Sequence, residues 1–319
     1  MTEDRAEIVD ALKTPLDRDE VIVLLLWHLG DVLNATSLLP ALRRRHHRRL
    51  SFVTLSECVP ILRNHPDIDR IRVLEFPMAT RFTMELWDRL RVLHQELFPG
   101  HEAIYNLHKP VDLKRMPRHI IEHWAQAIGI DITWRDMRPL FRTVTKFQPN
   151  PALGDYIAIG NGGNDPAKRW PDAQWQRLLA WLRSRYPRLR QIQVGAPGDT
   201  RVDGVEDLRG RTIEESFWLV HHARLCITND SFLAHLAGVS GCPTVTIFGP
   251  TSPLQFRPLA PDTVLPVGGH DYRTPCSRNL CRLVRGYLPC IAFPSMRRVA
   301  AATERALALA GRGNGTEFN

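Results

Sequence analysis

The fold is decided by residues 21–55, which read VIVLLLWHLGDVLNATSLLPALRRRHHRRLSFVTL. Val21–Trp27 is apolar throughout, which is typical of a strand buried on both faces of a sheet. Asp31–Arg45 repeats apolar residues at helical spacing, and Leu50–Leu55 is a second apolar run. A strand, a helix and another strand in this order predict a parallel βαβ unit.

The same alternation continues along most of the chain. Further strands are predicted at Ile71–Phe76, Ala103–Leu107, Tyr156–Gly160, Gln191–Val194, Leu225–Thr228 and Thr244–Phe248. Further helices are predicted at Val59–Arg63, Thr83–Leu97, Ile120–Ile128, Asp172–Arg185, Ile213–His222, Phe232–Val239 and Ser295–Ala310. This pattern is typical of α/β folds, in which helices cover both faces of a parallel sheet.

The chain length and one irregular stretch predict two domains. The 319 residues are about twice the usual domain length of roughly 100–200. Thr145–Gly154 has two prolines and no periodicity, as linkers do. We therefore predict two doubly wound, Rossmann-like domains at residues 1–150 and 151–319, which face each other across a cleft and bind ligands beyond the carboxyl ends of their strands. The last helix could return to pack on the first domain.

The charge balance is basic, with 42 Lys+Arg against 34 Asp+Glu and a formal net charge of +8. One basic run spans residues 43–49, and a second group lies at Arg278, Arg282, Arg285, Arg297 and Arg298. Such groups suit phosphates or acidic lipid surfaces, although a solvated helix end explains the first run equally well. No nucleic-acid-binding motif accompanies the charge, so no nucleic-acid partner is expected.

Nothing in the sequence predicts export or a membrane span. The longest apolar run, Val21–Trp27, is far shorter than the roughly 20 residues that cross a bilayer. The chain starts with MTEDR and no long apolar segment follows, so we expect a cytosolic protein. Its six cysteines are expected to be thiols or metal ligands rather than disulfides.

Two motifs place a glycine turn and a charged side chain after a predicted strand. In the first, Gly30 permits a tight turn and Asp31 starts the helix. A carboxylate there could accept a proton from a hydroxyl group, although Asp is also a common helix N-cap. The second motif, GNGGNDPAKRWP at residues 160–171, offers backbone amides and two cations to a diphosphate.

Two further motifs follow later strands. Asp230 and Ser231 lie where a strand passes into a helix, so the Ser231 amide and hydroxyl could bind phosphate. His235 lies four residues after Ser231 on the same helix face, where a buried structural histidine is the commoner case. The loop that contains Gly249 and Thr251 could close over a ligand or could be an ordinary turn.

Together these elements resemble glycosyltransferase family 9, the bacterial heptosyltransferases that build the lipopolysaccharide inner core from ADP-heptose. In the first half the resemblance rests on LGDVL at 29–33, LPAL at 39–42 and ILRNHPDID at 61–69. In the second half it rests on AKRWP at 167–171, NDS at 229–231, HLA at 235–237 and FGPT at 248–251. It extends from about Val21 to the final helix.

The resemblance implies a GT-B fold, an acceptor-binding domain followed by a nucleotide-sugar-binding domain, inversion at the anomeric carbon and no required metal or cofactor. It implies Asp31 as the general base, with Gly30 and Asn34 in the acceptor loop. The donor-binding residues would be Gly162, Lys168, Arg169, Asp230, Ser231, His235, Gly249 and Thr251, with Lys168 on the diphosphate and Asp230 on the sugar. The implied partners are ADP-heptose and an anionic glycan or glycolipid acceptor, with peripheral contact to the inner membrane.

The sequence departs from the family pattern at Phe232-Leu233 and, in the first motif, at His28 and Asn34. The family has Gly after the Asp-Ser pair, whereas this chain has Phe232-Leu233, which leaves the identity of the sugar open. Cys276, Cys281 and Cys290 could ligate zinc or iron with a fourth residue such as His270, but free thiols are the expected state.

Three other functions stay open at this point. The chain could use a different nucleotide sugar, or it could change the stereochemistry of a nucleotide sugar without transferring it. It could also be a non-catalytic nucleotide-sugar sensor or a membrane-docking subunit, although the joint presence of Asp31, Lys168 and Asp230 argues for catalysis.

Overall fold

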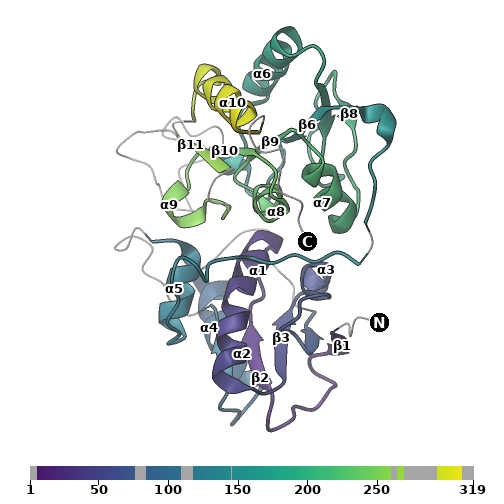
Figure 1. The fold of residues 1–319 in the computed structure, drawn as a ribbon. Coiled ribbons are helices and arrows are strands. Elements are labelled where there is room, and N and C mark those ends of the chain that lie inside the picture. Colours follow the sequence, from purple (N-terminus) through teal and green to yellow (C-terminus); the bar gives the residue numbers. More distant parts are fainter. Residues whose placement is uncertain are drawn as a thin grey trace. The chain divides into compact units, whose positions relative to one another are not determined.

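The computed structural model describes residues 6–75, 84–108, 118–144, 146–259, 264–268 and 293–310. The chain divides into two compact units, residues 1–144 and 145–319 (Figure 1). Each unit is built on one parallel sheet. Within the described part of the chain, no helix has the length and apolar character needed to cross a membrane.

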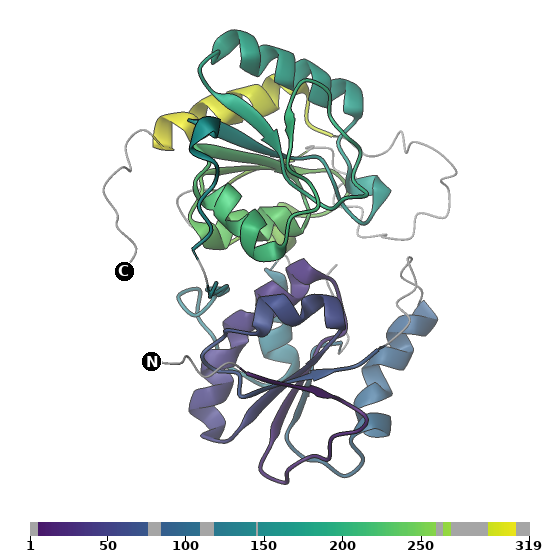
Figure 2. The same cartoon turned by 90° about the vertical axis from the view of Figure 1, so that its right-hand side faces the viewer.

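The first unit has a five-stranded sheet in the order β1-β4-β3-β2-β5. Its strands are β1 (Glu7–Asp10), β2 (Val21–Leu24), β3 (Leu50–Thr54), β4 (Arg70–Val73) and β5 (Ile104–Asn106). Its helices are α1 (Leu29–Ala35), α2 (Leu39–His46), α3 (Val59–Leu62), α4 (Met84–Leu97) and α5 (Ile120–Ala127), with short 3-10 turns at Thr36–Leu38 and Ser56–Cys58. Figure 2 shows α4 on the opposite side of the sheet from α1 and α2.

The second unit has a six-stranded sheet in the order β11-β10-β9-β6-β7-β8. Its strands are β6 (Tyr156–Gly160), β7 (Arg190–Gln193), β8 (Glu206–Asp207), β9 (Leu225–Asn229), β10 (Thr244–Phe248) and β11 (Val264–Gly268). Its helices are α6 (Asp172–Arg185), α7 (Ile213–His221), α8 (Phe232–Ser240), α9 (Pro253–Phe256) and α10 (Met296–Ala310), with 3-10 turns at Pro151–Leu153 and Pro166–Lys168.

Helices α6 and α10 cover one face of the second sheet, and α7 packs beside α8 on the other face (Figure 1). The core under α6 and α10 is apolar and includes Trp175, Leu178 and Val299. The final helix therefore packs on the second sheet, whereas the sequence had left open a return to the first domain.

The strands and helices predicted from apolar runs are present, with two differences. The predicted helix Asp31–Arg45 is divided into α1 and α2 by a 3-10 turn, because Pro40 has no N–H to donate to the preceding turn. The edge strands β1, β8 and β11 were not predicted. At the edge of a sheet a strand can be short and partly polar, as β1 (EIVD) and β8 (ED) are, and it then shows no apolar run. Strand β11 is apolar but contains Pro266, which argues against a strand in the sequence and is tolerated at a sheet edge.

The strand orders place a topological switch point in each sheet. In the first sheet, β2 lies between β3 and β5. The chain adds β3 and β4 on one side of β2 and then crosses to add β5 on the other side. In the second sheet, β6 lies between β7 and β9 in the same way. Ligands of doubly wound sheets bind at the carboxyl ends of such strand pairs.

A buried histidine closes the carboxyl end of β2. The Leu26 backbone N–H donates to Nε2 of His108 at 3.1 Å, and the other ring nitrogen faces Oδ1 of Asn106 at 2.9 Å. Burial lowers the pKa of His108 to about 4. The ring is therefore neutral near pH 7, with Nε2 free of a proton to accept from Leu26.

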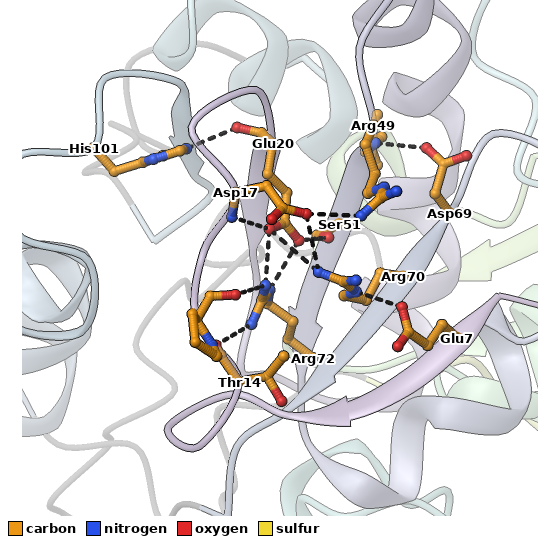
Figure 3. A network of polar contacts seen from close by, with 12 residues as sticks. Glu7, Thr14, Asp17, Glu20, Arg49, Ser51, Asp69, Arg70, Arg72 and His101 are labelled. Carbon is orange, nitrogen blue, oxygen red and sulfur yellow. Dashed lines mark hydrogen bonds and ion pairs between the residues drawn. The ribbon is translucent and has the colours of Figure 1, made fainter.

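A buried ion pair fastens the amino-terminal edge of the first sheet (Figure 3). Arg72 donates to both carboxylate oxygens of Glu20, at 2.9 and 2.8 Å, and neither side chain is exposed. The same guanidinium donates to the backbone oxygens of Thr14 and Pro15, which holds the β1–β2 connection against the sheet. Ser51 donates its hydroxyl proton to Glu20.

The contacts of Glu20 outweigh the cost of its burial. Burial alone would raise the pKa of this carboxyl, but the hydrogen bonds from Arg72 and Ser51 and the charge of Arg72 lower it overall. The pair therefore contributes its stability above pH of about 4.5, the ordinary value for Glu, and loses it as the pH falls further.

We expect Arg72→Ala to lower the free energy of unfolding by about 3–5 kcal/mol, because it leaves the Glu20 carboxylate buried without a partner. The measurement is urea unfolding of the full chain. Arg49→Ala is the matched control, since Arg49 pairs with Asp17 at 2.7 Å on the same edge but both side chains are half-exposed. That change should cost less than about 1 kcal/mol, and equal losses in the two variants would contradict this account.

Candidate active site

Glycine at the end of β6 allows the start of α8 to approach the sheet. A Cβ atom at Gly160 would overlap Leu233 and would lie 2.7 Å from Oγ1 of Thr228. No other residue fits there without displacing its neighbours. The first turn of α8 is therefore packed directly onto the switch point between β6 and β9.

Three of the predicted donor-binding residues lie together at this switch point. Nζ of Lys168 is 3.0 Å from Oδ2 of Asp230, and Thr251 donates its hydroxyl proton to the same oxygen at 2.5 Å. The Asp230 backbone N–H donates to the Ile247 carbonyl, so this carboxylate is fixed between β9 and β10. Asp230 is 3% exposed and Lys168 is 26% exposed, so the ammonium group can still reach an anionic ligand.

Asp230 is not the N-cap of α8. The N-cap of α8 is Ser231, in an extended conformation and without a side-chain capping bond in the described structure. Its hydroxyl lies 3.4 Å from that of Thr228. The Ala234 N–H donates to the Ser231 carbonyl. The amides that precede it at the start of α8 form the kind of helix N-terminus that binds phosphate groups. His235 lies one turn further along α8 and is buried.

Arg169 has a contact that the sequence did not predict. Its Nε donates to the Gly163 carbonyl at 2.9 Å, which ties the glycine-rich turn to the turn that carries Lys168. Arg169 therefore shapes the site through this bond, while the rest of its half-buried guanidinium still contributes positive charge.

The sequence analysis missed one acidic residue of this region, Asp199. Its carboxylate occupies the space beside two glycines, because a Cβ atom at Gly162 or Gly195 would overlap it. It accepts a hydrogen bond from Ala196 N at 2.8 Å. In Rossmann-type domains an acid after the second strand binds ribose hydroxyls, and Asp199 follows β7, the second strand of this unit. The sequence signal was an acid four residues after the glycine that ends a predicted strand.

Gly249 serves packing in the described structure. It follows β10, and a Cβ atom there would lie 2.5 and 2.7 Å from ring atoms of Phe293. This close approach holds the segment before α10 against the strand end. The loop after Gly249 then brings Thr251 to Asp230.

Asp31 lies in the first unit, at the carboxyl end of β2. The N-cap of α1 is His28, and Asp31 is the third helical residue, so it is not the N-cap. Its half-buried carboxylate sits in the first turn, where the helix dipole favours negative charge. Burial raises the pKa of the Cys58 thiol to about 12, and the charges of Glu57 and Asp31 add to this rise, which places Asp31 near the carboxyl end of β3.

Gly30 and Asn34 lie on the same helix as Asp31. Gly30 is buried in its first turn. Asn34 follows Asp31 by one turn and is 2% exposed, and its Oδ1 has no hydrogen-bond partner among the described residues. An ordered water is the expected partner of this oxygen.

The basic run at residues 43–49 ends α2 and has structural contacts. Arg43 pairs with Asp69 at 2.7 Å, and Arg45 donates to the Gly129 carbonyl at 2.7 Å. For Arg43 and Arg45, these bonds support a structural role at the end of a helix rather than ligand binding. The run lies at the amino-terminal edge of the first sheet, away from Asp31.

The possible metal ligands Cys276, Cys281, Cys290 and His270 lie outside the described residues, as do Arg278, Arg282 and Arg285. Across the ranges that the structure describes, no group of three or more His, Cys, Asp or Glu side chains could hold a metal ion. The described cysteines are buried free thiols: Cys58, Cys226 and Cys242.

Comparison with known proteins identifies the class. The family model described as glycosyltransferase family 9 (heptosyltransferase) matches residues 126–285, about half of the chain. The chain therefore belongs to glycosyltransferase family 9, as its sequence motifs predicted.

Individual relatives agree with this assignment. Lipooligosaccharide heptosyltransferase 2 of Haemophilus influenzae is 30% identical over 135 residues. That match covers 37% of this chain and only 39% of the relative.

Solved structures confirm the predicted α/β fold with two Rossmann-like domains. A glycosyltransferase of family 9 from Veillonella parvula has a TM-score of 0.65 at 17% identity, over 92% of this chain and 99% of that one. The Escherichia coli ADP-heptose lipopolysaccharide heptosyltransferase II has a TM-score of 0.61 at 18% identity, over 91% of this chain and 98% of that one. At these identities the likeness concerns the fold.

We expect Gly162→Ala to weaken ADP binding about tenfold or more, because the added methyl displaces the Asp199 carboxylate and costs at least one ligand hydrogen bond. Calorimetric titration with ADP measures the effect. Gly198→Ala is the matched control, since Gly198 directly precedes Asp199 and a Cβ atom there meets nothing within 4 Å. Equal affinity of the two variants for ADP would contradict the role of Asp199.

Proposed function

We propose that this chain is an inverting glycosyltransferase that transfers a heptose from ADP-heptose to an acceptor hydroxyl. The observation that carries the proposal is the contact of Lys168 and Thr251 with Asp230 at the switch point between β6 and β9. Membership of family 9 supports it. In this proposal the first unit binds the acceptor and the second unit binds the donor.

The donor side is suited to stabilising a departing nucleoside diphosphate. Lys168 is partly exposed beside the first turn of α8, so its charge and the helix amides can act on the same phosphate groups. Asp230 and Thr251 hold the lysine in place before the reaction begins. Such fixed groups stabilise the negative charge that grows on the leaving diphosphate. Asp199 would accept hydrogen bonds from the ribose hydroxyls.

Asp31 is the proposed general base. Its carboxylate would take the proton of the acceptor hydroxyl as that oxygen attacks the anomeric carbon. The bond from this carbon to the diphosphate oxygen breaks on the opposite face, which inverts the configuration. The electron pair of the broken bond leaves with ADP, next to Lys168.

The acceptor in this proposal is a hydroxyl of a lipopolysaccharide core or of a related anionic glycan. The name of the Haemophilus influenzae relative supports that substrate class. The formal net charge of +8 suits a phosphorylated acceptor and peripheral contact with an anionic membrane. No cofactor takes part in these steps, and the three cysteines of residues 276–290 are proposed to be free thiols.

The second candidate donor is a nucleotide sugar other than ADP-heptose, and one feature of α8 supports this alternative. Phe232 and Leu233 open α8 at the switch point, and Leu233 packs directly against Gly160. Bulky side chains therefore stand in the first turn that would contact the donor.

The test of the donor is a calorimetric titration of the full chain with ADP-heptose and with UDP, GDP and dTDP sugars. We expect ADP-heptose to bind at least about tenfold more tightly than the others, since a pocket shaped for one base and sugar leaves polar groups unpaired with another. Tighter binding of another nucleotide sugar would be consistent with a glycosyltransferase but would contradict heptose as the transferred sugar. No binding of any of them would discard the function.

We expect Asp31→Asn to lower turnover by about 10²–10⁴-fold, because the amide cannot accept the hydroxyl proton. Donor affinity should stay within about twofold, since Asp31 belongs to the other unit. Steady-state rates with a lipopolysaccharide-core acceptor measure the first effect. Glu57→Gln is the control, an exposed acid near the same strand ends that should leave turnover nearly unchanged. Near-normal turnover of Asp31→Asn would contradict the proposal that Asp31 is the general base.

A further inference from the structure

The side chain of Asn229, the last residue of β9, makes three hydrogen bonds to backbone groups. Its Nδ2 donates to the carbonyl oxygens of Asn161 at 2.6 Å and Gly162 at 3.2 Å. Its Oδ1 accepts from the Trp170 N–H at 3.2 Å. The side chain is fully buried and directly precedes Asp230.

These three bonds join two turns that are separate in the sequence. Asn161 and Gly162 belong to the glycine-rich turn after β6, and Trp170 ends the turn that carries Lys168. The bond from Arg169 to the Gly163 carbonyl joins the same two turns a second time. The spacing between the amides of the first turn and the ammonium group of the second is therefore set by Asn229 and Arg169.

The network continues from Asn161 to the loop that carries Asp199. Gln193 donates to Oδ1 of Asn161 at 2.8 Å, and both side chains donate to the Thr200 carbonyl at 2.8 Å. Both side chains are neutral amides, and both are buried. The network fixes three loops at the carboxyl ends of β6, β7 and β9 without adding charge to the site.

We propose that Asn229 is a positioning residue for the diphosphate of the donor. It acts by holding the glycine-rich turn and the Lys168 turn at the distance that lets both contact one diphosphate. The proposal rests on the diphosphate-binding part of the proposed function, but not on the identity of the sugar or the base.

The chemistry of the position explains why an amide is needed. The side chain must donate twice, to two carbonyl oxygens, and accept once, from an N–H group. A carboxylate would place an acceptor oxygen against both carbonyls in place of the donating NH2 group, and an apolar side chain would remove all three hydrogen bonds.

The chain offers a matched control in Asn106, the last residue of β5 in the other unit. Its Nδ2 donates to the carbonyl oxygens of Leu90 at 3.0 Å and Arg91 at 3.1 Å, and its Oδ1 accepts from the His108 N–H at 2.9 Å. It is fully buried as well. Both asparagines donate to two carbonyl oxygens and accept from one backbone N–H, and Asn106 also contacts the rings of His94 and His108. Only Asn229 joins turns of the proposed donor site.

The experiment compares Asn229→Ala with Asn106→Ala in the full chain. Calorimetric titration gives the affinity for inorganic pyrophosphate and for ADP, ligand-observed NMR gives the affinity for adenosine, and thermal unfolding gives the stability. We expect Asn229→Ala to weaken pyrophosphate and ADP binding about 10- to 100-fold and to leave adenosine binding within about twofold. Asn106→Ala should lower the melting temperature by a similar amount and leave all three affinities within about twofold.

Other outcomes separate the proposal from its alternatives. Equal losses of pyrophosphate and adenosine binding would mean that Asn229 only stabilises the unit, and would overturn the proposal. Unchanged pyrophosphate binding would overturn it too. If the wild-type chain binds pyrophosphate but prefers a nucleotide sugar other than ADP-heptose, the donor assignment fails and the Asn229 test still stands. If it binds no diphosphate, both proposals fail.

If Asn229→Ala does not fold, Asn229→Ser and Asn106→Ser replace the first pair. Serine is too short to reach both turns, but it keeps one polar group to satisfy a buried partner. The expected affinities and the overturning results are the same as for the alanine pair.

Discussion

The structure depends on a polar residue that partners backbone groups where a buried parallel strand ends. A strand inside a parallel sheet is apolar, but the chain that leaves it exposes N–H and C=O groups that need partners. Asn106 and Asn229 fill this role in the two units, each at the end of the strand that flanks the switch point. The same constraint that stabilises the fold thereby determines where the backbone amides near each site lie.

The two edges of the first sheet serve different purposes. The amino-terminal edge holds the buried pair of Glu20 and Arg72, the exposed pair of Arg49 and Asp17, and the partly buried pair of Arg70 and Glu7. The carboxyl edge carries Asp31, which is half-buried at a helix start. Charge that is satisfied internally contributes stability, whereas charge that stays partly exposed can act on a ligand.

Sequence reasoning predicted the parts of this protein that are local. Apolar runs such as Val21–Trp27 gave the central strands, and the motifs around Lys168, Asp230 and Thr251 gave residues that the structure brings together. It missed the edge strands β1 and β8, which are short and acidic, and β11, whose apolar sequence VLPVG is interrupted by a proline. It also missed Asn229 and the pairing of Glu20 with Arg72, because those contacts join residues more than 50 positions apart and one sequence carries no sign of them.

The charges at the proposed donor site show why the position of neutral groups matters. Lys168 is paired with Asp230, and Asp199 adds a second carboxylate nearby, so the side chains of the strand ends bring little net positive charge. In the proposed function, the attraction for a diphosphate therefore depends on Arg169 and on the amides of the glycine-rich turn and of α8 as well as on Lys168. The attraction between a charge and a dipole falls off faster with distance than that between two charges. A site that relies on amide dipoles is therefore sensitive to small displacements of its turns, and the hydrogen bonds of Asn229 and Arg169 oppose such displacements.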